Sequence, residues 1–201
     1  MATSARKVGV YGGAFDPPHL GHVVVAAEAA WQLGLDEVRL VPVGIPVHRH
    51  APHTDAATRV ELVRGAVAGL PALRVSTIET DRPEPSFTID TLRTLAAAEP
   101  EVEWTLIVGA DQVEVFDTWL EPQAIVELAR LGVVARAETD DAEAAAAARR
   151  HAPGRFDVIS IPRIDISSTL IRARIAARTP FSHLVSPAVA RMIADRGLYG
   201  R

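Results

Sequence analysis

The chain has 201 residues and a formal charge of −4, with 21 Lys and Arg against 25 Asp and Glu, and 48% of its residues are hydrophobic. This length and hydrophobic content suit one domain with a buried core, and the lack of a basic excess argues against general binding to nucleic acid. With no Cys and no apolar run of the ~20 residues that span a bilayer, the composition excludes thiol catalysis, Cys-based zinc sites and a membrane partner, and we expect a cytoplasmic protein.

Short apolar runs alternate along the chain with longer stretches of helical periodicity. Strands are predicted at residues 7–11, 37–43, 73–78, 104–108, 131–134 and 157–161. Helices are predicted at residues 21–34, 56–70, 88–98, 168–177 and 187–196, with an Ala-rich helix at 142–150 that we expect to be exposed and without functional role. This alternation is typical of an α/β fold, a doubly wound parallel sheet with helices on both faces. Such folds bind ligands where their strands end at the carboxyl side.

The loop after the first predicted strand has the features of a phosphate site. Gly12 and Gly13 let backbone N–H groups approach an anion closely. His19 and His22 stand three residues apart at the start of a predicted helix, so they share a face at a helix end that favours anions. The same residues also fit an ordinary tight turn, a helix cap or a pair of metal ligands. Metal binding is the weakest of these readings, because no Cys or nearby carboxylate completes a ligand set.

Polar residues also follow the second and fourth predicted strands. His48 and Arg49 form a cationic tip after the second strand, whereas His50 and His53 fit a solvated loop. After the fourth strand, Gly109 and Asp111 form a turn that can accept a ribose hydroxyl, and Asp111 also suits the N-cap of a short helix. Trp119 lies further on and fits either the core or a platform that stacks on a planar ring.

The last polar group opens the helix predicted at 168–177. Ser167, Ser168 and Thr169 bring three hydroxyls to this helix start, and Arg172 follows one turn later. A helix start with an Arg fork suits an anion, although an ordinary Ser or Thr N-cap explains the hydroxyls as well. Two such helix starts at opposite ends of the chain, facing one crevice, would suit a nucleoside triphosphate better than a single phosphate.

These two segments resemble known signatures. GGAFDPPHLGH at 12–22 and ISSTLIR at 166–172 are similar to those of the nucleotidyltransferase superfamily with the (T/H)xGH motif. Within it, the chain resembles the bacterial nicotinate-nucleotide adenylyltransferase family, through IPVHR at 45–49, PSFTIDTL at 85–92, GAD at 109–111, FDTW at 116–119 and GLY at 197–199. The resemblance spans nearly the whole chain and implies a single Rossmann-like domain over 1–201, with a core at 1–165 and a helical segment at 166–201.

The resemblance also implies a reaction and a set of site residues. The implied reaction transfers the AMP moiety of ATP to nicotinate mononucleotide in NAD biosynthesis, giving deamido-NAD and pyrophosphate, with Mg²⁺ bound through the phosphates and not by protein side chains. The implied catalytic residues are His19, His22 and Arg172. The implied ATP-binding residues are Gly12, Gly13, Phe15, Gly109, Asp111, Ile166, Ser167, Ser168 and Thr169. The implied acceptor-binding residues are Asp16, His48, Arg49, Thr88 and Trp119, and Asp16 is expected to orient the loop and not to act as a base.

Three segments depart from the family's usual pattern. Val47 and Arg49 stand where the family commonly has Pro and Lys, and Arg keeps the charge but changes the donor geometry. Leu120 replaces an aromatic residue, and residues 135–141 lack an Arg-Pro-Gly turn. The acceptor therefore stays open between nicotinate mononucleotide, nicotinamide mononucleotide and phosphopantetheine. A catalytically silent nucleotide-binding module and a homo-oligomeric state also stay open.

Overall fold

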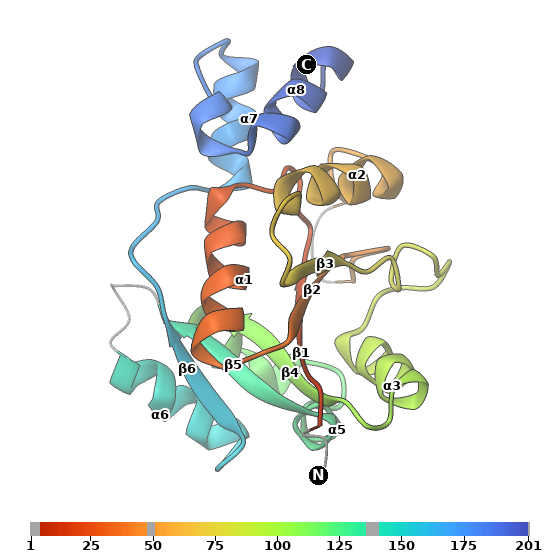
Figure 1. Cartoon of the computed structure of the whole chain (residues 1–201), viewed down its shortest axis with the longest axis vertical. Helices are drawn as coiled ribbons and strands as arrows, with labels where there is room; N and C mark the ends of the chain where they lie inside the picture. Colours follow the sequence, from red (N-terminus) through yellow and green to blue (C-terminus); the bar gives the residue numbers. More distant parts are fainter. Residues whose placement is uncertain (1–4, 48–50, 136–140, 201) are drawn as a thin grey trace.

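The structure is a computed structural model that describes residues 5–47, 51–135 and 141–200 (Figure 1). Six strands form one sheet in the order β3-β2-β1-β4-β5-β6, and all neighbouring strands are parallel. The strands are β1 (Lys7–Gly13), β2 (Glu37–Pro42), β3 (Leu73–Val75), β4 (Glu103–Gly109), β5 (Ala129–Ala135) and β6 (Phe156–Ser160). The predicted α/β fold is confirmed. The chain winds outward from β1 to β3 and then returns to β4 beside β1, so β1 and β4 form the switch point of the sheet.

Helices cover both faces of the sheet. One face packs against α1 (Leu20–Gln32) and α2 (Ala56–Val67), and the other packs against α3 (Thr88–Ala98), α4 (Ala110–Glu114), α5 (Pro122–Leu128) and α6 (Asp141–His151). The central strands are buried on both faces: Leu106 and Val108 of β4 join one core cluster, and Ile107 joins the other. This explains why β4 reads in sequence as a continuous apolar run and not as an alternating one.

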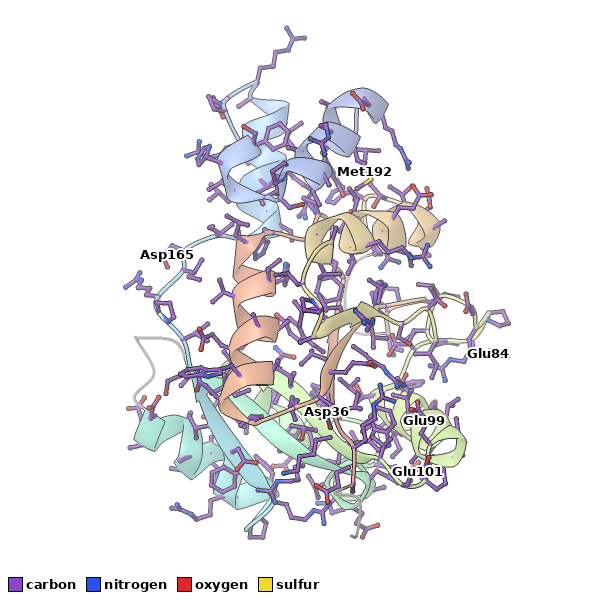
Figure 2. All side chains as sticks on the ribbon, viewed as in Figure 1. Asp36, Glu84, Glu99, Glu101, Asp165 and Met192 are labelled. Carbon is purple, nitrogen blue, oxygen red and sulfur yellow. The ribbon has the colours of Figure 1, made fainter. Side chains whose placement is uncertain are left out.

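The last two helices pack on α2 at the end of the molecule away from the N-terminus (Figure 1). They are α7 (Ser168–Ala176) and α8 (Pro187–Arg196). Leu62 of α2 packs with Ile171 of α7 and Ile193 of α8 in a third core cluster. Gly65 of α2 leaves room for Met192, which is labelled where α8 approaches α2 in Figure 2. This packing places α7 and α8 beyond the first turn of α1, at the carboxyl ends of the central strands.

The Ala-rich helix α6 corrects one prediction. A helix does form at Asp141–His151, but Ala144, Ala147 and Ala148 are buried against the sheet. The expectation of an exposed helix is therefore wrong for this face, because the small Ala side chains let the helix approach the sheet closely. In addition, α5 and the short helix η1 (Phe116–Thr118) are present where no helix was predicted. None of the helices within the described ranges is long and apolar enough to cross a bilayer.

Candidate active site

A cleft of about 1070 Å³ opens where β1 and β4 end. Its size lies at the upper end of the roughly 300–1,000 Å³ that small-molecule sites occupy. The predicted site residues that line it are Gly12, Gly13, Phe15, Asp16, His22, Thr88, Gly109, Asp111, Trp119, Ser168, Thr169 and Arg172. His19, Ile166 and Ser167 lie outside the set of described residues that line the cleft, and His48 and Arg49 lie outside the described residues altogether.

The two predicted anion-binding segments meet at this cleft. Arg172 donates a hydrogen bond from Nη1 to the backbone carbonyl of Asp16, at 2.7 Å. Ser168 donates from its hydroxyl to the backbone carbonyl of Pro17, at 2.8 Å. The side chain of Arg172 also reaches the hydroxyl of Thr169, at 3.2 Å. The loop after β1 and the start of α7 are therefore bound to each other at one cleft, where the sequence predicted only that they face the same crevice.

The paired histidines stand at the start of α1. His19 is the N-cap residue and is buried, and its backbone N–H donates to Nδ1 of His22 at 3.2 Å. The two rings lie 3.7 Å apart between centroids. Gly21 leaves room for this stacking, because a Cβ at that position would lie 3.0 Å from Nδ1 of His19 and would press on its ring. His22 faces the cleft, and its ring also packs edge-on against Phe15, 4.9 Å away.

The loop after β1 is anchored by its own buried aromatic residue. Phe15 has a φ of 50° and an exposure of 1%. A residue with a side chain is strained in this left-handed region, by on the order of 1–3 kcal/mol, and stays there only where its surroundings hold it. The ring of Phe15 lies beneath Gly13, where a Cβ would come within 3.0 Å of it. Gly13 thus lets the aromatic ring support the loop from below.

The side chain of Asp16 accepts several hydrogen bonds. Its Oδ1 accepts hydrogen bonds from the hydroxyl of Thr54, at 2.7 Å, and from the hydroxyl of Tyr199, at 2.8 Å. Its Oδ2 accepts from the backbone N–H of His53. His53 is exposed, as a solvated loop predicts, yet its backbone takes part in this network. Both carboxylate oxygens are occupied, which fits the expectation that Asp16 orients the loop.

A buried cation lies beneath the same loop and was missed by the sequence analysis. Arg59 of α2 is 2% exposed and donates to the backbone carbonyl of Ala14 at 3.1 Å. Burial lowers the pKa of the Arg59 guanidinium, and Asp16 is the strongest of the nearby groups that oppose this effect. No sequence signal distinguishes Arg59, since one Arg in an amphipathic helix most often lies on the exposed face.

The end of β4 contributes a compact turn. Gly109 is the N-cap of α4, so the alternative in which Asp111 caps this helix is wrong. Asp111 lies in the first turn of α4 and folds back over Gly109, where any Cβ would collide with its carboxylate. Gln112 donates to the carboxylate of Asp111 at 2.8 Å. Because Gly109 and Asp111 both line the cleft, this turn can meet a ligand hydroxyl.

The opposite wall of the cleft has an aromatic and an amide face. Thr88 is the first residue of α3 and lines the cleft, and the first N–H groups of a helix have no partner within the helix. Trp119 packs on Phe116, with ring centroids 5.3 Å apart, and also lines the cleft. Trp119 is partly buried, packs against the first core cluster and also lines the cleft, so the two readings of its sequence position are compatible.

Glu79 also lines this wall and was not predicted. It is 8% exposed, and Thr91 donates a hydrogen bond to its carboxylate at 2.8 Å. Burial raises the pKa of Glu79, against the opposing effect of its hydrogen bonds to Thr91 and Ser86. The hydroxyl of Ser86 accepts from the backbone N–H of Gly44 at 3.1 Å. Glu79 therefore joins the loop after β2 to the segment that leads into α3.

The start of α7 combines capping with ligand-facing groups. Ser167 is its N-cap and accepts from the backbone N–H of Leu170 at 3.1 Å, as the capping alternative predicts. Ile166 packs in the third core cluster. The residues that follow, Ser168 and Thr169, face the cleft. Within the described part of the chain, no group of three or more His, Cys, Asp or Glu is placed to hold a metal ion.

Comparison with known proteins points to one family. Residues 10–174 match a family model described as Cytidylyltransferase-like. A protein of Albidiferax ferrireducens named "Probable nicotinate-nucleotide adenylyltransferase" is 38% identical over 194 residues, which cover 96% of this chain and 98% of that protein. A protein of the same name from Shouchella clausii is 37% identical, covering 97% of both chains. In fold, the chain is similar to the solved structure of Plasmodium falciparum nicotinic acid mononucleotide adenylyltransferase complexed with NaAD, with a TM-score of 0.79 at 18% identity, covering 96% of this chain and 97% of that one.

Proposed function

The chain belongs to the cytidylyltransferase-like family and, within it, to the nicotinate-nucleotide adenylyltransferases, and from this premise we propose that it transfers the AMP moiety of ATP to nicotinate mononucleotide. A phosphate oxygen of the mononucleotide attacks the α-phosphorus of ATP, and the bond from that phosphorus to the β-phosphate bridge breaks. The products are deamido-NAD and pyrophosphate. The acceptor supplies the nucleophile, so the protein needs to position the two substrates and stabilise charge.

One observation carries the proposal: the two anion-binding turns are hydrogen-bonded to each other over a single cleft. Arg172 and Ser168 of α7 hold the carbonyls of the loop after β1, at 2.7 and 2.8 Å. A triphosphate laid across this junction would touch both turns at once. The cleft is large enough to take a second nucleotide beside it.

We assign the charge-stabilising roles to groups at the junction. His22 and His19 would face the α- and β-phosphates, with Gly12 and Gly13 donating backbone N–H groups beside them. Arg172 would use its remaining donors for the β- and γ-phosphates, together with Ser168 and Thr169. Preorganised donors of this kind stabilise charge as it develops in the transition state. Ile166 and Ser167 would contribute by fixing the start of α7, and Phe15 by supporting the loop.

The walls of the cleft would hold the two nucleosides. We place adenosine at Gly109 and Asp111, whose carboxylate is a suitable partner for a ribose hydroxyl. We place the pyridine ring on Trp119, with its carboxylate at the amide face that begins at Thr88. His48 and Arg49 remain proposed contacts to the acceptor, and Asp16 is proposed to orient the loop.

Mg²⁺ belongs to the proposal as part of the MgATP substrate. The described residues offer no cluster of three carboxylate or imidazole groups for an ion, and phosphate oxygens are ligands that Mg²⁺ prefers. We therefore expect the ion to enter and leave on phosphates. Because both substrates are charged nucleotides that do not cross membranes unaided, we place the reaction in the cytoplasm.

A pyrophosphate-release assay tests the proposal. In parallel reactions, the enzyme is incubated with MgATP and one acceptor, which is nicotinate mononucleotide, nicotinamide mononucleotide or phosphopantetheine. We expect the highest kcat/KM with nicotinate mononucleotide and formation of deamido-NAD by chromatography. A higher kcat/KM with nicotinamide mononucleotide would refute the acceptor assignment, and one with phosphopantetheine would refute the nicotinate branch. Release of no pyrophosphate with any acceptor would indicate a silent nucleotide-binding module.

A further inference from the structure

The chain's last turn reaches back to the nucleotide loop. Tyr199 follows α8, and its hydroxyl donates to Oδ1 of Asp16 at 2.8 Å across 183 positions of sequence. The turn is built from two left-handed residues, Gly197 with a φ of 61° and Tyr199 with a φ of 63°. Gly adopts this conformation freely, whereas a Tyr there is strained. The hydrogen bond from the Tyr199 hydroxyl to the buried carboxylate of Asp16 helps to keep Tyr199 in this strained conformation.

Asp16 links the contact with Tyr199 to the start of α7, the second of the two proposed anion-binding turns. Its side chain accepts from Tyr199 and Thr54, while its own backbone carbonyl accepts from Arg172. The side chain of Asp16 is thus held by the C-terminal turn, and its backbone carbonyl in turn holds the guanidinium of Arg172. The position of Arg172 relative to the loop depends on where Asp16 is held.

The surroundings of Asp16 fit this role. Asp16 is 3% exposed, and Arg59 supplies a buried positive charge nearby while binding the carbonyl of Ala14. A carboxylate in such a place accepts several hydrogen bonds and donates none when ionised. Tyr199 is half-buried, and burial raises the pKa of its hydroxyl. The phenol is therefore protonated at neutral pH and serves as a donor.

We propose that Tyr199 is a positioning residue of the adenylyl transfer: through Asp16 it sets the distance between the loop after β1 and Arg172. This inference rests on the proposed function, because it concerns the same cleft. It gives a physical role to the terminal Gly-Leu-Tyr segment, which lies outside the residues assigned to substrates. Loss of the hydroxyl leaves the ring, and with it the packing of α8, in place.

Tyr199→Phe is the direct test, with Thr54→Val as a second variant that removes the other hydroxyl from the same oxygen. Initial rates give kcat and KM for each substrate, and calorimetry with a non-hydrolysable ATP analogue gives affinity without turnover. We expect kcat/KM for ATP and analogue affinity to fall about tenfold in both variants, near the lower limit for losing a hydrogen bond to a charged group. The KM for nicotinate mononucleotide should rise less than that for ATP, because Thr88 and Trp119 at the acceptor wall are untouched and Asp16 is proposed to orient the loop.

Ser186→Ala is the matched control. Ser186 caps α8 by accepting from Val189 at 3.3 Å and donates to Gly65 at 2.9 Å, so its loss weakens the C-terminal helices without touching Asp16. We expect a lower Tm and unchanged kinetic constants. Equal kinetic losses in Ser186→Ala and Tyr199→Phe would overturn the proposal, and so would wild-type constants in Tyr199→Phe.

A double-mutant cycle tests the path through Arg172. In an Arg172→Lys background, Tyr199→Phe should cause little further loss, because the contact that Asp16 positions is already altered. Losses that multiply would show that Tyr199 acts by another route and would refute the proposal. Failure of the proposed function is distinguishable, since it would appear as a wild-type enzyme that makes no deamido-NAD, while analogue binding still reports on Tyr199.

Discussion

The two ends of the sheet differ in how their charged side chains are paired. At the amino ends of the strands, Arg39 binds Glu99 through two hydrogen bonds, at 2.5 and 3.0 Å, and Arg6 binds Glu37 at 2.7 Å. Arg39 also lies over the ring of Trp104, 5.1 Å from its centroid. Figure 2 shows Glu99 near the end of the molecule where the chain begins. Arg6, Glu37, Arg39 and Glu99 thus form one set of ion pairs, and these contacts contribute to stability.

At the carboxyl ends, three charged side chains are buried. Asp16, Arg59 and Glu79 are 3%, 2% and 8% exposed, and none of them forms an ion pair with another described residue. They are held by hydroxyls and by backbone groups instead. Burying charge in this way disfavours folding. We therefore attribute the arrangement to the cleft, which these buried side chains help to shape, and not to stability. The comparison indicates that ion pairs stabilise the sheet at its amino end, whereas the buried charges at its carboxyl end hold the loops that we propose to bind ligands.

The largest effect is expected at the paired histidines. His19→Ala removes one preorganised donor, and kcat should fall by about 10²–10³-fold. The measurement is the rate of pyrophosphate release at saturating MgATP and nicotinate mononucleotide, with the Tm as a check on folding. His183→Ala is the control, because His183 is an exposed residue of η2 (Ser182–Leu184). Turnover near that of the wild type in His19→Ala would remove His19 from the mechanism.

Arg172→Ala is expected to have the next largest effect. It removes the fork that holds the carbonyl of Asp16 and the hydroxyl of Thr169, together with the cation that we propose for the β- and γ-phosphates. ATP affinity should fall by roughly 10–100-fold, the range for charge-assisted hydrogen bonds. Calorimetry with an ATP analogue measures this. If the affinity for the acceptor fell while that for ATP held, the two subsites would be assigned in reverse.

Local signals explain which parts of the fold could be predicted. The helix α8 begins and ends where the sequence predicts, because Ser186 caps it, Pro187 opens it and Gly197 takes the left-handed position after it. The strand order depends on contacts between distant segments, for which no local pattern exists. The burial of α6 was missed for a related reason: Ala144 and Ala147 are compatible with water or with a sheet, and only packing decides.

The same distinction separates the site residues that were predicted from those that were missed. Gly12, His22 and Ser168 stand at the ends of strands or helices, where residue type alone indicates a backbone or anion role. Arg59 sits inside a helix with no such signal. The contact between Tyr199 and Asp16 joins the two ends of the chain, so it became visible only when the fold brought them together.

Glu79→Gln should raise stability near neutral pH by about 1 kcal/mol, a usual size for a single buried substitution. Burial raises the pKa of Glu79, so the folded state binds its proton more tightly than the unfolded state does. Below the pKa that Glu79 has in the unfolded chain, the side chain is protonated in both states and does not destabilise the fold. The destabilisation develops as pH rises from there through the raised pKa of the folded state. The gain in Glu79→Gln should therefore vanish in acid. Urea unfolding across pH measures it, and a gain that persists in acid would contradict this explanation.

Glu99→Gln should give the smallest effect and the opposite sign. The hydrogen bond from Arg39 holds the pKa of Glu99 below its usual value, so its stabilising contribution is present above the unfolded pKa and is lost as pH falls. The variant should lose about 1 kcal/mol or less near neutral pH, since such pairs lie near the surface, and nothing in acid. Its kinetic constants should match the wild type, because the amino ends of the strands are remote from the cleft. A kinetic defect in Glu99→Gln would mean that the two ends of the sheet are coupled and would break the contrast between them.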